Sequence, residues 1–144
     1  MLGKTIFELS IGDKASFQKT ISESDVYLFA GISGDNNPAH LNDVEASKTI
    51  FKERIAHGML TASLISAVLG TQLPGPGTIY LGQDLKFLAP VKFGDTIKAS
   101  VEVTEIVRDK NIVKLNTVCI NQFGNVVIEG MATVMPPKII NMED

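Results

Sequence analysis

An uncharged, strongly apolar stretch at residues 58–73 constrains the fold of this chain more than any other feature of the sequence. Apolar side chains fall on every face of a helix drawn through it, which is typical of a helix that is buried all round. The Pro-Gly-Pro-Gly sequence at 74–77 ends that helix, because neither residue type continues it. We therefore expect one long core helix around which the rest of the chain is arranged.

Small residues recur at every fourth position of the expected core helix, at Gly58, Ala62, Ser66 and Gly70. Residues four apart lie one above the other on a helix, so these four form a narrow stripe. Such a stripe lets another backbone or a ligand approach the helix closely.

The second half of the chain is typical of β-structure. Residues 96–108 alternate between apolar and polar side chains, and turn sequences at 108–111 and 123–125 join neighbouring strands as hairpins. We expect strands at 15–20, 79–88, 96–108, 112–122 and 126–135. The predicted fold class is α+β, with a curved, mostly antiparallel sheet wrapped around a long central helix. An open sheet edge and an uncovered face predict a homodimer.

Two shorter helices are expected ahead of the core helix. Ser22 and Asp25 have the spacing of a capping box, so a helix should follow them and end among the glycines and serine of residues 31–34. Asp43 and Glu45 stand near the start of a second short helix at 42–48, where the positive end of the helix dipole favours acidic side chains.

Length and composition limit the classes of protein to consider. The chain has 144 residues, which fits a single domain at 1–144, and its 44% hydrophobic residues, 20% charged residues and net charge of -3 argue against nucleic-acid binding. No segment is long enough to span a bilayer, and the N-terminus lacks the apolar core of a signal peptide. The single cysteine, Cys119, excludes a disulfide framework. We expect a cytoplasmic protein with no nucleic-acid or membrane partner.

Both histidines of the chain, His40 and His57, lie in one window that also holds Asp35. A turn built by Asn37 and Pro38 can direct Asp35 and His40 toward one water molecule, as general acid–base catalysis requires. Each residue also has a structural explanation, because aspartate is common in Asx turns and a lone histidine is more often a half-buried, hydrogen-bonded residue. The pairing of the two favours a proton-transfer site.

Gly58 is a candidate oxyanion site at the start of the core helix. A buried helix N-terminus offers unpaired amides that stabilise a carbonyl oxygen as it gains negative charge. The alternative is a glycine required only for close packing. His57 is expected to cap or pack at the helix start, or else to contact a ligand. Ser66 is expected to bond back to the helix, or else to orient the substrate or the catalytic pair.

Other kinds of site fit the sequence less well. A serine hydrolase would need a Gly-x-Ser-x-Gly sequence, which the chain lacks. Two histidines without a second cysteine supply too few ligands for a metal, so no metal site is predicted. Lys48, Lys52 and Arg54 form a small basic cluster, which is either a solvated turn or a site for the phosphates of an anionic carrier.

The sequence GDNNPAH at 34–40, followed by IAHGML at 55–60, resembles the signature of MaoC-like (R)-specific enoyl-CoA hydratases. The segments at 80–87 and 90–95 also resemble the strand pattern of that family, so the similarity covers nearly the whole chain. It is strongest with the short hydratases that supply polyhydroxyalkanoate synthesis. The resemblance implies a hot dog fold, in which a sheet wraps a long helix, and a dimer whose sheets join edge to edge.

The resemblance also implies a role for individual residues. Asp35 and His40 would hold a water molecule that adds its oxygen to the β-carbon, and a proton to the α-carbon, of a trans-2-enoyl thioester. The backbone amide of Gly58 would bind the thioester oxygen. Ser66 would support the active site, and Leu69 would lie at the acyl pocket.

The resemblance therefore predicts a hydro-lyase that reversibly converts (2E)-enoyl-CoA to (3R)-3-hydroxyacyl-CoA, with no cofactor other than the coenzyme A of the substrate. Asn37 would brace the loop, and Asn42 stands where relatives commonly carry aspartate. Two alternatives remain. A hot dog thioesterase usually has a carboxylate on or beside the core helix, and residues 58–73 contain none. A non-catalytic acyl-CoA binding module would have no use for an Asp35 and His40 pair.

Overall fold

The structure is a computed structural model that describes residues 1–140. The N-terminal half contains one strand and four helices, in the order β1 (Lys14–Thr20), α1 (Glu23–Ser33), α2 (Pro38–Leu41), α3 (Asp43–Ser47) and α4 (Gly58–Thr71). The C-terminal half contains β2 (Ile79–Gln83), β3 (Lys86–Phe87), β4 (Thr96–Val107), the short 3-10 helix η1 (Arg108–Lys110), β5 (Ile112–Ile120) and β6 (Val126–Met135).

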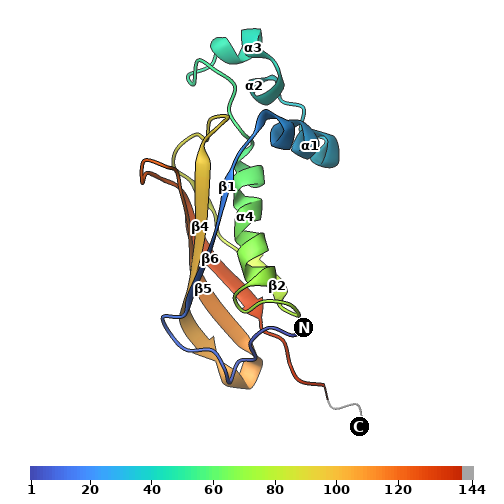
Figure 1. The fold of residues 1–144 in the computed structure, drawn as a ribbon, viewed down its shortest axis with the longest axis vertical. Helices are drawn as coiled ribbons and strands as arrows, with labels where there is room; N and C mark the ends of the chain where they lie inside the picture. The colour runs from blue at the N-terminus through green and yellow to red at the C-terminus, as the bar shows by residue number, and fades with distance from the viewer. Residues whose placement is uncertain (141–144) are drawn as a thin grey trace.

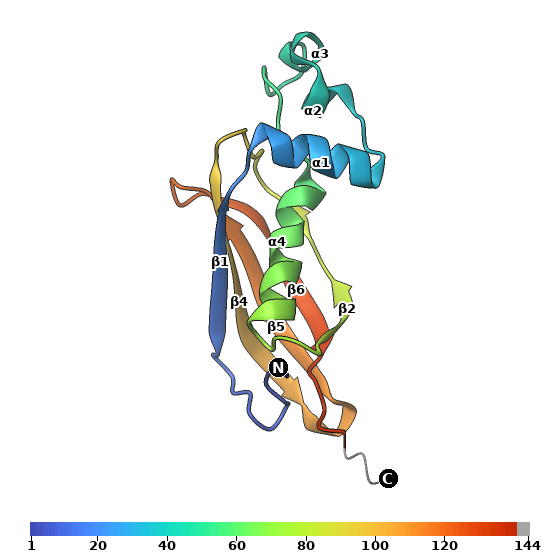
Figure 2. The same cartoon turned by 45° about the vertical axis from the view of Figure 1, so that its right-hand side comes forward.

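The six strands form one antiparallel sheet in the order β1-β4-β5-β6-β2, with β3 also paired to β6. Figures 1 and 2 show the sheet curving around α4, while α1, α2 and α3 extend beyond the end of the sheet that lies farthest from the two termini. This is the hot dog arrangement that the resemblance implies, and the α+β class is confirmed. The hairpins expected at 108–111 and 123–125 connect β4 to β5 and β5 to β6.

The core lies between α4 and the concave face of the sheet. Four apolar side chains of β4 each have a relative exposure of 1% or less, and they are Ile97, Ala99, Val101 and Val103. Facing them, α4 contributes Ile65, Val68 and Leu69, which are buried to the same degree. Each large aliphatic side chain buried in this way stabilises the fold by about 1.5–3 kcal/mol. The apolar side chains that alternate along the sequence of β4 therefore form the face of the sheet against which α4 packs.

The expectation that α4 is buried all round is wrong for the single chain. Met59 is 56% exposed, and Ser63, Ser66 and Gly70 are also exposed along the same side of the helix. The physical reason is that one curved sheet covers only one side of a helix, so the opposite side has no covering element. Much of the small-residue stripe lies on this open side.

The helix boundaries follow capping interactions that the sequence predicts. Ser22 Oγ accepts a hydrogen bond from the Asp25 amide at 3.1 Å, and the Asp25 carboxylate accepts one from the Ser22 amide at 2.9 Å, so the capping box is confirmed. Gly34 ends α1 in the left-handed conformation, at φ 79°. The second predicted helix is confirmed as α3, with Asn42 as its N-cap.

The segment expected as one strand at 79–88 is two strands. The register with β6 shifts between Tyr80 and Gly82, and the chain then bends between β2 and β3. At the bend the Asp84 carbonyl lies so close to Gly130 that a Cβ there would collide with it. Alternation alone could not show this break, because it arises from a close approach between β6 and a distant segment.

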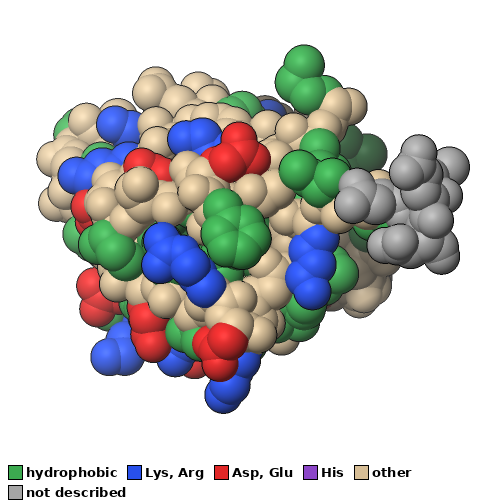
Figure 3. Space-filling model, turned by 90° about the horizontal axis from the view of Figure 1, so that it is seen from below, with side chains coloured by type: hydrophobic (Ala, Val, Ile, Leu, Met, Phe, Trp, Pro, Cys, Tyr) green, Lys and Arg blue, Asp and Glu red, His purple; other side chains and the backbone are tan. Residues whose placement is uncertain are grey.

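Among residues 1–140, no helix has both the length and the apolar character needed to cross a membrane. Figure 3 shows the end of the molecule nearest the termini, where basic and acidic side chains are interspersed with hydrophobic ones. Among the described residues, this face therefore carries no extended patch of one charge.

Candidate active site

Short-range hydrogen bonds shape the loop that carries Asp35. The Asp35 carboxylate accepts a hydrogen bond from the Asn37 amide at 3.2 Å, which is the Asx turn considered as its structural explanation. The side chain of Asn37 in turn accepts from the Ala39 amide at 3.0 Å and caps α2, with Pro38 at the first helical position. This short helix was not expected from the sequence. It places His40 about one turn beyond Asn37, on the same side of the loop as Asp35.

His40 is buried at 9% exposure, and a backbone carbonyl fixes its tautomer. Its Nδ1 lies 2.7 Å from the carbonyl oxygen of Ile55, which can only accept, so Nδ1 carries the proton. In the neutral ring the lone pair is then on Nε2. A histidine held in this way is arranged to accept a proton at one defined atom.

His57 supports the Asp35 loop and does not cap α4 with its side chain. Its ring is 2% exposed, stacks on His40 with centroids 3.9 Å apart, and lies 4.8 Å from the Phe29 ring. Its Nε2 donates to the carbonyl oxygen of Asp35 at 2.9 Å. The packing expected of His57 is therefore confirmed, and the expectation that its side chain caps α4 is wrong.

The three polar side chains of the window converge. A carboxylate oxygen of Asp35 and one ring nitrogen each of His40 and His57 lie within 4.8 Å of one another. One water can bridge two acceptors that lie up to about 5 Å apart, so these groups are close enough to share a water. The arrangement suits a metal less well, because stacked rings tilted by 28° direct their in-plane lone pairs side by side and not toward a common point.

Gly58 begins α4 beside these groups. The first amides of a helix have no partner within it, and His57 provides no side-chain cap, so the Gly58 amide is available to a ligand. A Cβ at Gly58 would lie 2.6 Å from the Phe87 ring, so the close-packing explanation for this glycine also holds. Both expectations for Gly58 are compatible with the structure, because the amide and the Cα position are different parts of the residue.

A cavity of about 450 Å³ opens at this site. Its polar lining side chains are Asp35, His40, His57 and Thr61. The rest of its lining is Gly58 and apolar residues, contributed by the segment before α4, by Met59, by the segment at 87–91 and by β6. A largely apolar cavity with a few polar groups at one end is typical of a site for a small molecule with an apolar portion.

Ser66 and Leu69 do not line this cavity in the single chain. Ser66 lies two turns beyond Gly58, roughly 12 Å along the helix axis, and it is exposed. Leu69 is 1% exposed and packs in the main core against the sheet. The structure therefore brings Asp35, His40, His57 and Gly58 together, but it does not bring these two residues to them.

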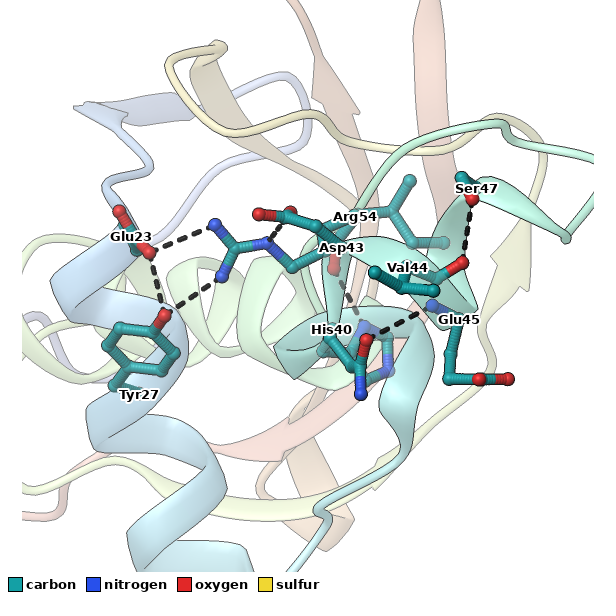
Figure 4. Close-up of polar contacts among 10 residues, drawn as sticks. Glu23, Tyr27, His40, Asp43, Val44, Glu45, Ser47 and Arg54 are labelled. Atoms are coloured by element: carbon teal, nitrogen blue, oxygen red, sulfur yellow. Dashed lines mark hydrogen bonds and ion pairs between the residues drawn. The ribbon is translucent and has the colours of Figure 1, made fainter.

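The basic cluster predicted near residues 48–54 is largely neutralised. Arg54 donates to Glu23 and to Tyr27, both at 2.9 Å, and to Asp43 at 2.5 Å, as Figure 4 shows. Burial alone would lower the pKa of Arg54, but these hydrogen bonds outweigh it and raise the pKa above its ordinary value. Lys48 pairs with Glu45. Arg54 therefore ties α1 to α3, and the structure does not support a phosphate site built on it.

Sequence reasoning missed Thr61 and Phe87. Thr61 lines the cavity one turn beyond Gly58, and its position on the Gly58 face could have been found from the spacing of three residues. The Phe87 ring reaches Gly58 from β3, and no local pattern connects two residues so far apart in the chain.

Comparisons with known proteins agree with the fold described above. Residues 7–122 match the family model described as MaoC like domain. The chain is 60% identical to an (R)-specific enoyl-CoA hydratase of Rhodospirillum rubrum, over 90% of each chain. Among solved structures, the unliganded R-hydratase PhaJ1 of Pseudomonas aeruginosa is 48% identical, with a TM-score of 0.89 over 99% of this chain and 93% of that one. An (R)-hydratase of A. caviae involved in PHA biosynthesis is 46% identical, with a TM-score of 0.86 over 90% of this chain and 98% of that one.

Proposed function

The chain belongs to the MaoC-like domain family, and from that membership we propose that it is an (R)-specific enoyl-CoA hydratase. It reversibly hydrates (2E)-enoyl-CoA to (3R)-3-hydroxyacyl-CoA and is therefore a hydro-lyase. The relative that is 60% identical carries this name. The single observation that supports the activity most directly is the convergence of the Asp35 carboxylate with a ring nitrogen of His40 at one end of an apolar cavity.

In the proposed reaction, a single water molecule donates two hydrogen bonds, one to His40 Nε2 and one to the Asp35 carboxylate. Its oxygen lone pair attacks the β-carbon of the enoyl thioester, and the π electrons move to the thioester oxygen to form an enolate. One of the two bases takes a proton from the water, and a proton is returned to the α-carbon. One molecule of water is added in total, and both bases are restored.

The Gly58 amide binds the thioester oxygen as the enolate forms. The N-terminus of α4 adds the positive end of a helix dipole, and a preorganised donor of this kind typically contributes about a hundredfold to a thousandfold in rate. Because the water is held between Asp35 and His40, it reaches only one face of the substrate, which accounts for a single product configuration.

The partner of this site is a small acyl-CoA, and the acyl chain occupies the apolar part of the cavity. Coenzyme A enters as part of the substrate, with no metal and no separate cofactor. The likeness to a hydratase involved in PHA biosynthesis supports supply of 3-hydroxyacyl-CoA for polyhydroxyalkanoate as one use of the product. The setting we propose is the cytoplasm, without a nucleic-acid or membrane partner.

The working unit is a homodimer. The strand β2 is the end strand of the sheet and exposes Ile79, Tyr80 and Leu81, and no charged residue protects it. Met59 and the open side of α4 are also exposed, and so is Asp35. A second copy that pairs at β2 would cover these surfaces and exclude bulk water from the catalytic water.

Replacing Asp35 with Asn or His40 with Gln tests the proposal. Each change removes an acceptor for the catalytic water while keeping the shape of the side chain, so kcat for crotonyl-CoA hydration should fall at least about a hundredfold. The assay follows the loss of enoyl absorbance, and circular dichroism checks the fold. Asn36→Ala, in the same loop, serves as the control and should retain the parental rate.

Near-parental activity in either site variant would contradict the assigned roles. Chiral analysis of the product should give the (3R) isomer, and a (3S) product would contradict the facial assignment. Release of free thiol from the same substrate would indicate a thioesterase, because hydration leaves the thioester bond intact. Tight binding without either reaction would indicate a binding module.

A further inference from the structure

Two buried polar side-chain atoms have no hydrogen-bond partner among residues 1–140, Nδ1 of His57 and Oγ1 of Thr61. His57 is 2% exposed, Thr61 is fully buried, and both line the cavity of the proposed active site. Buried polar atoms are nearly always paired in folded proteins, so two unpaired atoms at the N-terminal end of α4 require an explanation.

The two atoms have complementary hydrogen-bonding character. His57 Nε2 lies 2.9 Å from the Asp35 carbonyl oxygen, which only accepts, so the proton of the neutral ring is on Nε2. Nδ1 is then an acceptor, and the Thr61 hydroxyl can donate to it. Thr61 is four residues after His57, and side chains on a helix lean toward its N-terminus, so the Thr61 side chain leans toward the end of α4 where His57 is the N-cap residue.

The Thr61 hydroxyl also differs from three other hydroxyls on the helices among residues 1–140. Ser33, Ser63 and Thr71 each donate to a backbone carbonyl three or four residues earlier, at 2.5–2.7 Å. Such a back-bond is the usual way for a hydroxyl on a helix to be satisfied. Thr61 does not make it, although its hydroxyl is the more deeply buried.

We propose that Thr61 is a positioning residue that donates a hydrogen bond to His57 Nδ1 and, through this ring, fixes Asp35 in the active site. The two atoms are not bonded to each other in the structure. Rotation about the Cα–Cβ bond of Thr61, or one buried water between the two atoms, completes the bond.

The bond fixes the tautomer of His57, because an occupied Nδ1 keeps the proton on Nε2. Nε2 in turn holds the Asp35 carbonyl, and the stacked ring supports His40. This inference rests on the proposed hydratase activity for its effect on rate, but the hydrogen bond itself does not depend on that activity.

The kinetic test compares Thr61→Val, which keeps the shape and removes the hydroxyl, with Thr61→Ser, which keeps the hydroxyl. We expect Thr61→Val to lower kcat for crotonyl-CoA by about tenfold to a hundredfold with KM changed less than about twofold, because the loop that orients Asp35 is loosened. Thr61→Ser should restore most of the rate. The control is Thr71→Val on the same helix, which should retain the parental kcat. A Thr61→Val enzyme with parental kcat, or one in which only KM rises, would overturn the proposal.

A second measurement detects the hydrogen bond between Thr61 and His57 without relying on enzyme activity. The chain has only two histidines, so its imidazole ¹⁵N spectrum is simple, and His40→Gln identifies the signals of His57. We expect the proton of His57 on Nε2, an Nδ1 signal that shifts in Thr61→Val, and an unshifted signal in Thr61→Ser. A proton on Nδ1 in the parental protein would contradict the inference whether or not Thr61→Val folds. An Nδ1 signal that is unaffected in a folded Thr61→Val variant would also contradict it. If the parental protein does not hydrate crotonyl-CoA, the proposed function fails, and this spectrum still decides the role of Thr61.

Discussion

The two histidine rings carry their protons on opposite nitrogens, and backbone carbonyls impose the difference. Ile55 fixes the His40 proton on Nδ1, and Asp35 fixes the His57 proton on Nε2. One ring therefore presents an acceptor to the cavity, while the other braces the loop that carries the carboxylate. Two residues of one type, in stacked contact, thus have different chemical tasks because each has a different hydrogen-bond partner.

The thiol of Cys119 should be unreactive in the folded protein. It is fully buried on β5, and burial raises the pKa of its thiol to about 12. Because the thiolate is the reactive form, the native protein at pH 8 should not be alkylated by iodoacetamide, whereas the protein unfolded in guanidinium should take up one label. Cys119 is the only cysteine, so the mass of the intact protein reports on it alone. Rapid labelling of the native protein would contradict this burial.

Among the elements, α1 and α3 are joined by a single side chain from the segment before α4. Arg54 bonds to Glu23 and Tyr27 on α1 and to Asp43 on α3, and its guanidinium lies 4.8 Å from the centre of the Phe93 ring. The next residue, Ile55, supplies the carbonyl that fixes His40. The network therefore joins α1 and α3 to His40 through one short stretch of backbone.

Replacing Arg54 with Gln should lower the free energy of unfolding by about 1.5–3 kcal/mol, because hydrogen bonds between charged groups are lost and their partners remain. Arg54→Lys should recover little, since an ammonium lacks the planar fork that meets three partners. The control is Lys48→Gln, which breaks an exposed pair with Glu45 and should cost less than about 1 kcal/mol. Urea unfolding monitored by circular dichroism measures all three. Equal effects of Arg54→Gln and Lys48→Gln would show that the network adds nothing.

For the molecule as a whole, the unprotected edge at β2 and the open side of α4 explain why one chain leaves its proposed site exposed. Asp35 lies at the surface of the single chain, and Met59 beside it is 56% exposed. The proposed chemistry uses one positioned water from which bulk solvent is excluded, so it needs a cover over this region. The proposed homodimer supplies that cover without any change in the fold of the chain.

Leu81→Lys tests the dimer, because a lysine on an edge strand opposes pairing with another copy. We expect the parental protein to sediment as a dimer, and Leu81→Lys to dissociate and to lose hydratase activity in parallel. Phe123→Lys is the matched control, since Phe123 is 77% exposed but lies in the β5–β6 hairpin, away from β2. A monomeric parental protein that is fully active would contradict the model of a shared, covered site.

Much of the architecture followed from local patterns. The Ser22 capping box, the alternation along β4 and the apolar run of α4 each depend on residues close together in the chain, so they can be recognised from the sequence alone. The Asp35 and His40 pair was recognisable for the same reason. Three other features depended on packing between distant segments: the open side of α4, the break at Asp84 opposite Gly130, and the position of Leu69 in the main core. The tautomer of His40 and the unpaired Thr61 hydroxyl also depended on the tertiary structure. Hydrogen-bond partners and burial are set by residues that are close in space, and spacing along the chain does not show which residues these are.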